Sequence, residues 1–146
     1  MVIRDIIHPM TFSFQSRIGL GTWKMGEAAR SEGEEIKAIE AAIQMGYGLI
    51  DTAEMYASGN AETLIGKALK IAGHSKRDQL QIVSKVLPNN ASTKGTIAAC
   101  EASIKRMGSD YIDCYLLHWQ GSHSYEATIE GFLKLHERGL IRSYGI

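Results

Sequence analysis

The sequence lacks an excess of charge of either sign and any long apolar run. Its 146 residues include 16 Lys and Arg and 16 Asp and Glu, so the formal net charge is zero. Proteins that bind nucleic acid or acidic membrane surfaces need clustered Lys and Arg, so we expect neither partner. No apolar run approaches the roughly 20 residues that span a bilayer. The segment Met1–Ile6 alternates charged and apolar residues, unlike a signal peptide.

Cysteine is also scarce. Cys100 and Cys114 are the only two, and they lack the C-x-x-C spacing of redox and zinc sites. Free thiols packed in a core are typical of a reducing compartment, so we expect a cytoplasmic protein. No metal site is expected, because four of the histidines share no ligand spacing: His8, His74, His123 and His136.

A glycine-rich dinucleotide fingerprint is missing as well. Gly19 and Gly21 supply the first half of G-x-G-x-x-G, but Lys24 stands at the position of the third glycine. We therefore interpret Arg17–Trp23 as a short strand whose glycines let another group approach the backbone or keep a barrel interior uncrowded. An open doubly wound sheet would usually carry that phosphate-binding turn, so its absence disfavours such a fold.

The sequence does contain four helix signals at similar intervals. Each has a polar residue at its start, apolar residues at helical spacing, and a glycine just past its end. The predicted helices begin at or near Ser31, Asn60, Ser92 and Ser124, and they stop at Gly46, Gly73, Gly108 and Gly139. The residues predicted to face inward are Ile36, Ile39 and Ile43, then Leu64, Ala68 and Ile71, then Ile97, Cys100, Ile104 and Met107, and finally Ile129, Phe132 and Leu133.

Short apolar strands alternate with these helices. They are predicted at Leu49–Asp51, Leu80–Lys85, Tyr111–His118 and Ile141–Ile146. One helix between successive strands favours βαβ units and a parallel sheet. Ile3–Ile7 and Thr11–Gln15 are predicted to form a hairpin ahead of these units.

Polar residues at the strand ends sharpen this prediction. Asp51, Lys85 and His118 recur at intervals of 34 and 33 residues. One polar residue per unit, always at the C-terminal end of a strand, is what a (β/α) barrel active site requires. A complete barrel needs at least about 200 residues, so we expect residues 1–146 to form an incomplete TIM-type barrel of four βα units and a fifth strand.

The four ionisable residues Asp51, Tyr56, Lys85 and His118 fit one chemical task. If each strand's last residue faces the barrel axis, Asp51, Lys85 and His118 converge there, and Tyr56 can fold over them. An ammonium beside a phenol stabilises the phenolate, and a carboxylate can hold that ammonium in place. Such a set could protonate a carbonyl oxygen, with a neutral imidazole orienting it. Hydride has no source among side chains, so a nicotinamide cofactor is implied.

Several motifs resemble the N-terminal half of the aldo-keto reductase family. They are Gly19–Trp23, Ile50–Tyr56, Ile82–Lys85, Tyr115–Trp119 and Ile141–Ile146, the last resembling the family's entry into the fifth barrel strand. The resemblance implies NADPH-dependent reduction of an aldehyde or ketone, with Tyr56 as general acid, Lys85 and Asp51 tuning it, and His118 orienting the substrate. It also implies that Gly21, Thr22 and Asp51 contact the nicotinamide side of NADPH. Trp23 and Trp119 would line the substrate pocket.

In this family, the Ser-Asn motif and most of the cofactor site follow the segment that corresponds to Ile146. We therefore expect no useful NADPH turnover from residues 1–146 alone. The alternative hypothesis is a truncated, inactive half-barrel, or a regulatory or binding subunit. Such a protein would associate through the unpaired edges of its sheet.

Overall fold

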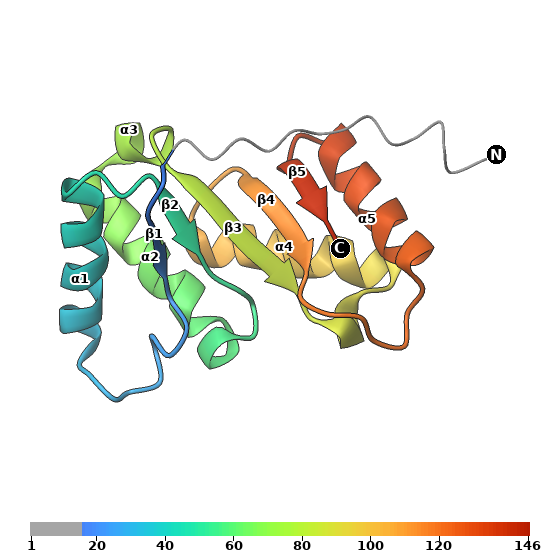
Figure 1. The fold of residues 1–146 in the computed structure, drawn as a ribbon, viewed down its shortest axis with the longest axis horizontal. Helices are drawn as coiled ribbons and strands as arrows, with labels where there is room; N and C mark the ends of the chain where they lie inside the picture. The colour runs from blue at the N-terminus through green and yellow to red at the C-terminus, as the bar shows by residue number, and fades with distance from the viewer. Residues whose placement is uncertain (1–15) are drawn as a thin grey trace.

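The computed structural model describes residues 16–146, in which helices and strands alternate along the chain (Figure 1). The strands are β1 (Gly19–Gly21), β2 (Leu49–Asp51), β3 (Gln81–Val86), β4 (Ile112–Leu117) and β5 (Ile141–Gly145). The long helices are α1 (Glu32–Gln44), α2 (Asn60–Ala72), α4 (Thr93–Met107) and α5 (Tyr125–Glu137), and three short ones are η2 (Tyr56–Gly59), α3 (His74–Arg77) and η3 (Pro88–Asn90). The predicted hairpin of Ile3–Ile7 and Thr11–Gln15 lies outside the described residues.

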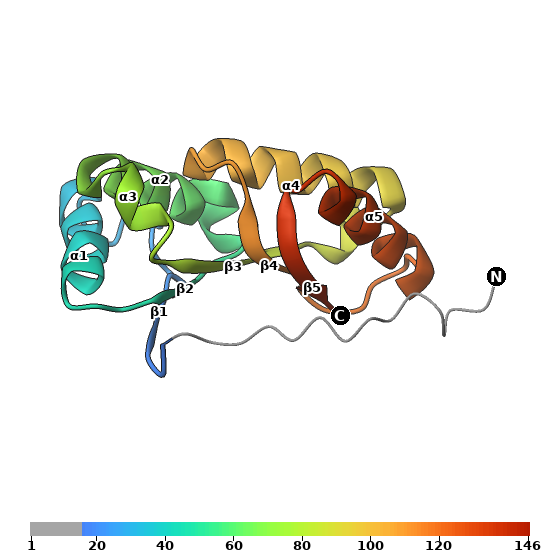
Figure 2. The ribbon, with the colours of Figure 1, turned by 90° about the horizontal axis from the view of Figure 1, so that it is seen from above.

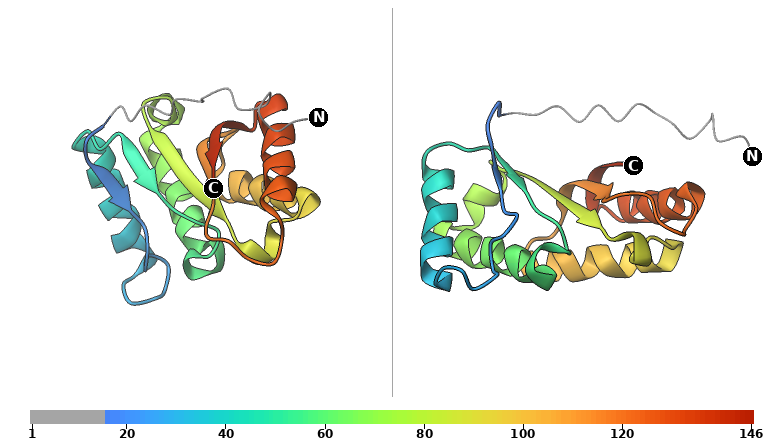
Figure 3. Two further views of the ribbon diagram at one scale, coloured as in Figure 1. Left: turned by 45° about the vertical axis from the view of Figure 1, so that its right-hand side comes forward. Right: turned by 60° about the horizontal axis from the view of Figure 1, so that its bottom comes forward.

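The five strands form one parallel sheet in chain order, β1-β2-β3-β4-β5, whose twist is visible in Figure 3. The prediction of βαβ units and a parallel sheet is therefore confirmed. Register places five residues in one row across the sheet: Gly21, Asp51, Val83, Cys114 and Ser143. Side chains alternate between faces along a strand, so Lys85, two residues after Val83, shares the face of Asp51.

Three of the four predicted helix starts are confirmed as serine caps. The hydroxyls of Ser31, Ser92 and Ser124 each accept a backbone N–H in the first turn of α1, α4 and α5. At α1 the cap is reciprocal, because Glu34 also accepts from the backbone N–H of Ser31. These bonds satisfy donors that have no partner within the helix, so they fix where each helix begins.

The predicted start of α2 near Asn60 and its stop at Gly73 are confirmed, but two other expectations about this helix are wrong. Asn60 is the first helical residue and not a cap, and the residue before it, Gly59, has no side chain to cap with. Ile71 is 64% exposed, although its spacing predicted an inward position. Leu64 and Ala68 are buried as predicted, and Ile65 and Leu69 complete the buried face of α2, which leaves Ile71 at its edge in the last turn. The first strand is also shorter than the predicted Arg17–Trp23.

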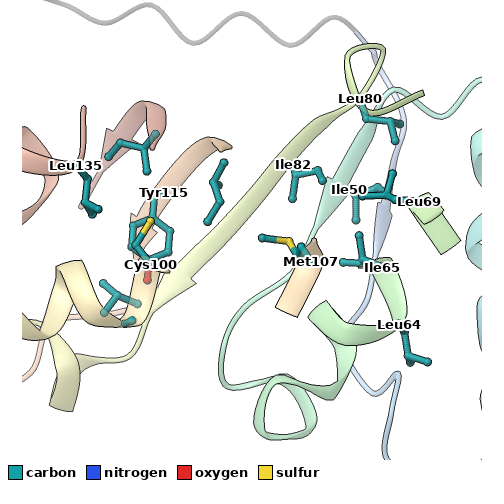
Figure 4. Close-up of a cluster of buried hydrophobic side chains, with 14 of the residues drawn as sticks. Ile50, Leu64, Ile65, Leu69, Leu80, Ile82, Cys100, Met107, Tyr115 and Leu135 are labelled. Atoms are coloured by element: carbon teal, nitrogen blue, oxygen red, sulfur yellow. The ribbon is translucent and has the colours of Figure 1, made fainter. Parts of the chain in front are cut away.

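The long helices pack on one side of the sheet, as Figure 2 shows. Side chains from all four join one apolar cluster with Ile50, Ile82 and Tyr115 of the strands. Figure 4 shows this cluster, in which Ile65 and Leu69 of α2 lie near Ile50, while Cys100 of α4 lies beside Tyr115. This layer fixes the strands, so their opposite face and their C-terminal ends are available to carry polar groups. No helix in the described part of the chain is long and apolar enough to cross a membrane.

Candidate active site

The C-terminal ends of β2 and β3 bring three of the predicted residues together. Nζ of Lys85 lies 2.8 Å from Oδ1 of Asp51 and 3.5 Å from the hydroxyl oxygen of Tyr56. The same ammonium donates to the carbonyl oxygen of Thr52 at 2.8 Å. The side chain of Lys85 is only 14% exposed, whereas that of Asp51 is 43% exposed. The ammonium is therefore fixed by one carboxylate and one carbonyl, with its third donor directed toward the phenol.

His118 joins the group from the end of β4. Its backbone N–H donates to the carbonyl of Val86 at 3.0 Å, which ties the residue to β3. Its ring meets that of Tyr56 edge to face, with centroids 5.8 Å apart and planes at 78°. Partial burial and the nearby Lys85 ammonium lower the pKa of His118 below its ordinary value of 6.5. The imidazole is therefore neutral at neutral pH, and a neutral imidazole carries one N–H that can donate.

Nδ1 of His118 is buried and has no hydrogen-bond partner among the described residues. The ring of Trp119 lies beside the imidazole, with centroids 4.6 Å apart, and Trp119 is 49% exposed. A large exposed ring next to a group that can donate a hydrogen bond is typical of a pocket wall for a small polar ligand.

The end of β1 supplies the remaining predicted residues. Thr22 is fully buried, and both its N–H and its hydroxyl donate to the carbonyl of Asp51 at 3.0 Å. Its side chain therefore holds β1 against β2. Gly21, the register partner of Asp51, has open space where a Cβ would stand. Trp23 follows and is 67% exposed, with the Lys24 ammonium 5.3 Å from its ring.

Sequence reasoning missed the role of Glu54. Its Oε1 accepts the backbone N–H of Leu87 at 2.6 Å and the side-chain amide of Asn90 at 3.0 Å. Glu54 therefore joins the segment before Tyr56 to the segment after β3. No sequence pattern marked it, because its partners lie 33 and 36 residues away in the chain.

Comparison with known proteins identifies the family of this sequence. Residues 17–146 match the sequence profile of the Aldo/keto reductase family. The chain belongs to this family. Among curated aldo-keto reductase relatives, it is 47% identical over 129 residues to "Methylglyoxal reductase YeaE" of Escherichia coli, covering 88% of this chain and 44% of that protein. It is 37% identical over 128 residues to the "Glyoxal reductase" of Bacillus subtilis, again covering 88% of this chain and 44% of that protein.

A solved aldo-keto reductase has the same fold. The enzyme from Klebsiella pneumoniae, crystallised in complex with NADPH, superposes with a TM-score of 0.80 at 45% identity. The alignment covers 87% of this chain and 43% of that one. The chain thus spans less than half the length of the relatives it matches. The five parallel strands and their helices are therefore an incomplete (β/α) barrel, as the strand spacing predicted.

Proposed function

We propose that this chain carries the proton-donating half of an NADPH-dependent carbonyl reductase, which converts an aldehyde or ketone to an alcohol. The observation that supports this most directly is the contact of the Lys85 ammonium with both Asp51 and the Tyr56 hydroxyl. A phenol is a weak acid at neutral pH, and a fixed positive charge next to it stabilises the phenolate that remains after proton transfer.

In this proposal the side chains divide the work on one carbonyl oxygen. Tyr56 donates the proton to that oxygen, and Lys85 stabilises the charge left on the phenol. Asp51 keeps the ammonium in place. Neutral His118 donates a hydrogen bond that orients the carbonyl, and the exposed rings of Trp23 and Trp119 flank the substrate.

NADPH would supply the hydride when bound. We place the nicotinamide end of that cofactor at the open space over Gly21, with Gly21 and Asp51 as its contacts. Thr22, predicted as a third contact, is fully buried, so in this proposal it acts only by holding β1 against β2. The crystallised complex of the Klebsiella relative with NADPH supports this choice of cofactor. The printed names of two relatives, a methylglyoxal reductase and a glyoxal reductase, support small dicarbonyl aldehydes as the substrate class.

The test is reduction of methylglyoxal, followed by the loss of NADPH absorbance, in the longest natural form of the protein that contains residues 1–146. We expect Tyr56→Phe to lower kcat by about two orders of magnitude or more, the usual range for a lost general acid. Tyr125→Phe is the matched control, because Tyr125 lies on the surface of α5. An unchanged kcat in Tyr56→Phe would remove Tyr56 from this role. For residues 1–146 alone we expect no steady turnover.

A second candidate function is association through the sheet edges. Among the described residues, β1 pairs only with β2 and β5 only with β4, so each has one side free to accept another strand. Analytical ultracentrifugation of residues 1–146 tests this. Self-association at micromolar concentration would support the proposal, and a monomer at these concentrations would contradict it.

A further inference from the structure

The backbone directly after Tyr56 takes a conformation that residues with a Cβ rarely adopt. Ala57 and Ser58 have φ of 49° and 53°, and Gly59 follows with φ of 90°. Left-handed backbone is unfavourable for Ala and Ser, so consecutive residues stay in it only where the surrounding structure holds them. Because the turn starts at Tyr56, the groups that hold it also determine where the phenol lies.

A buried carboxylate stands at the far end of this turn. Glu62, in the first turn of α2, is fully buried. Its Oε1 accepts the hydroxyl of Ser84 at 2.6 Å, and its Oε2 accepts Nε of Arg106 at 2.6 Å. A buried carboxylate is costly unless it is paired and hydrogen-bonded, and both of its oxygens here have a partner. Glu62 therefore joins α2 to β3 and to α4.

Arg106 is in turn packed against the turn itself. A Cβ placed on Gly59 would lie 2.7 Å from both Cδ and Nε of Arg106. The side chain of Arg106 therefore occupies the space that only a glycine leaves open. A further bond to the hydroxyl of Ser103, at 3.0 Å, fixes the guanidinium in this place.

The other partner of Glu62 is Ser84, which directly precedes Lys85 in β3. Ser84 directs its hydroxyl to Glu62 on the helix side of the sheet, and the next residue, Lys85, directs its ammonium to the opposite side. One carboxylate thus connects the turn that follows Tyr56 with the strand that carries Lys85. The Tyr56–Lys85 contact is 3.5 Å, at the upper limit of a hydrogen bond, so a small shift of either side would lose it.

We propose that Glu62 and Arg106 are positioning residues: their ion pair fixes the Arg106 guanidinium against Gly59, and this packing holds the left-handed turn that places the Tyr56 hydroxyl beside Lys85. Neither side chain contacts the reacting groups. The catalytic part of this inference rests on the function proposed above, whereas the structural part concerns the position of the Tyr56 ring and can be measured without turnover.

The experiment uses three variants and one control. Arg106→Met leaves the Glu62 carboxylate buried without its cation and should lower the melting temperature. Adding Glu62→Gln removes that buried charge and should restore much of the lost stability, but not the packing of Arg106 on Gly59. Glu101→Gln is the matched control, because Glu101 is on the same helix and pairs with Arg138 at the same 2.6 Å, but at the surface.

The readout is the nuclear Overhauser effect between the ring protons of Tyr56 and His118. The protein is labelled at tyrosine, and the Tyr56 signals are assigned by their loss in Tyr56→Phe. We expect the double variant to lose this contact while the control keeps it. Arg106→Lys, which retains the charge but not the planar group against Gly59, is the third variant, used if the double variant fails to fold. It should lose the contact at a smaller cost in melting temperature.

In the longest natural form, we expect the double variant to lower kcat by about tenfold with little change in KM, because a displaced acid affects chemistry more than binding. A folded double variant or Arg106→Lys variant with the wild-type ring contact would overturn the proposal. If the wild-type protein reduces no carbonyl compound yet the ring contact depends on the pair, the proposed function fails while the positioning role stands.

Discussion

The ion pair between Lys85 and Asp51 is diagonal across neighbouring strands. The register partner of Asp51 is Val83, and Lys85 lies two residues further along β3, so its ammonium reaches back to the carboxylate at 2.8 Å. The ammonium therefore lies at the C-terminal ends of the two strands, 3.5 Å from the hydroxyl of Tyr56.

Replacing Asp51 with Asn should reduce activity more than stability. The carboxylate is 43% exposed, so its pair with Lys85 should contribute no more than about 1 kcal/mol to the free energy of unfolding. Freed from the carboxylate, the ammonium would no longer be held beside Tyr56, and we expect kcat to fall by about ten- to a hundredfold. Urea unfolding and steady-state kinetics on the same preparation test both parts. Asp110→Asn is a surface control, and equal kcat in both variants would contradict the expectation.

His118 should titrate below its ordinary pKa of 6.5, since burial and Lys85 both disfavour the charged imidazole. The unfolded chain then binds a proton at higher pH than the native protein does. Stability should therefore decrease as pH falls from about 6.5 through the lower native pKa. His118→Gln should reduce this loss, measured as the difference in unfolding free energy between pH 7.5 and 5.

A direct measurement separates the two causes of the lowered pKa. We expect the NMR titration midpoint of His118 to rise in Lys85→Met, because a repelling charge is gone. The midpoint should stay below 6.5, because burial is the larger cause and remains. A midpoint that does not move in this variant would contradict the role given to Lys85.

Asp113 should be a major stability determinant. Its Oδ2 lies 2.8 Å from Arg77 and accepts the backbone N–H of Ile82, and the two paired side chains are 6% and 10% exposed. Asp113→Ala leaves the buried guanidinium of Arg77 without its counter-charge, so we expect the free energy of unfolding in urea to fall by about 3 to 5 kcal/mol. Arg142→Gln, which removes a 60% exposed partner 3.6 Å from the same carboxylate, should cost about 1 kcal/mol or less. Similar losses in both variants would contradict this difference.

Two helical glycines should respond oppositely to replacement by alanine. A Cβ on Gly66 would lie 2.6 Å from the carbonyl oxygen of Arg106, so α2 and α4 would have to separate, at a cost of about 1 to 3 kcal/mol. Gly33, near the start of α1, has open space, and alanine there should stabilise the protein by up to about 1 kcal/mol. Thermal unfolding of the two variants gives the comparison, and a stabilised Gly66→Ala would show that the helices are not in close contact.

Local chemistry made much of the fold predictable from sequence. Serines at three helix starts act through bonds to residues only three positions away, so their sequence context is sufficient. The regular spacing of Asp51, Lys85 and His118 indicated strand ends at one rim, and the structure places these residues around Tyr56. Their catalytic roles remain predictions.

Features that depend on distant partners were not predictable. Ser58-Gly59 is a common turn dipeptide, but the left-handed backbone of Ala57 and Ser58 is unusual for these residue types, and the packing of Arg106 from α4 on Gly59 is visible only in the structure. Likewise, Glu62 resembles any charged residue in a helical first turn, and its partner Arg106 is 44 residues away. Only the tertiary arrangement shows that this charge is buried.

The alternation of side chains along β3 also limits which insertions and deletions this gene could tolerate. Ser84 and Lys85 face opposite sides of the sheet, toward Glu62 and Asp51 respectively. Loss or gain of one residue within β3 would exchange these directions, placing a cation among the helices and a hydroxyl beside Asp51. Length changes in this strand should therefore be selected against.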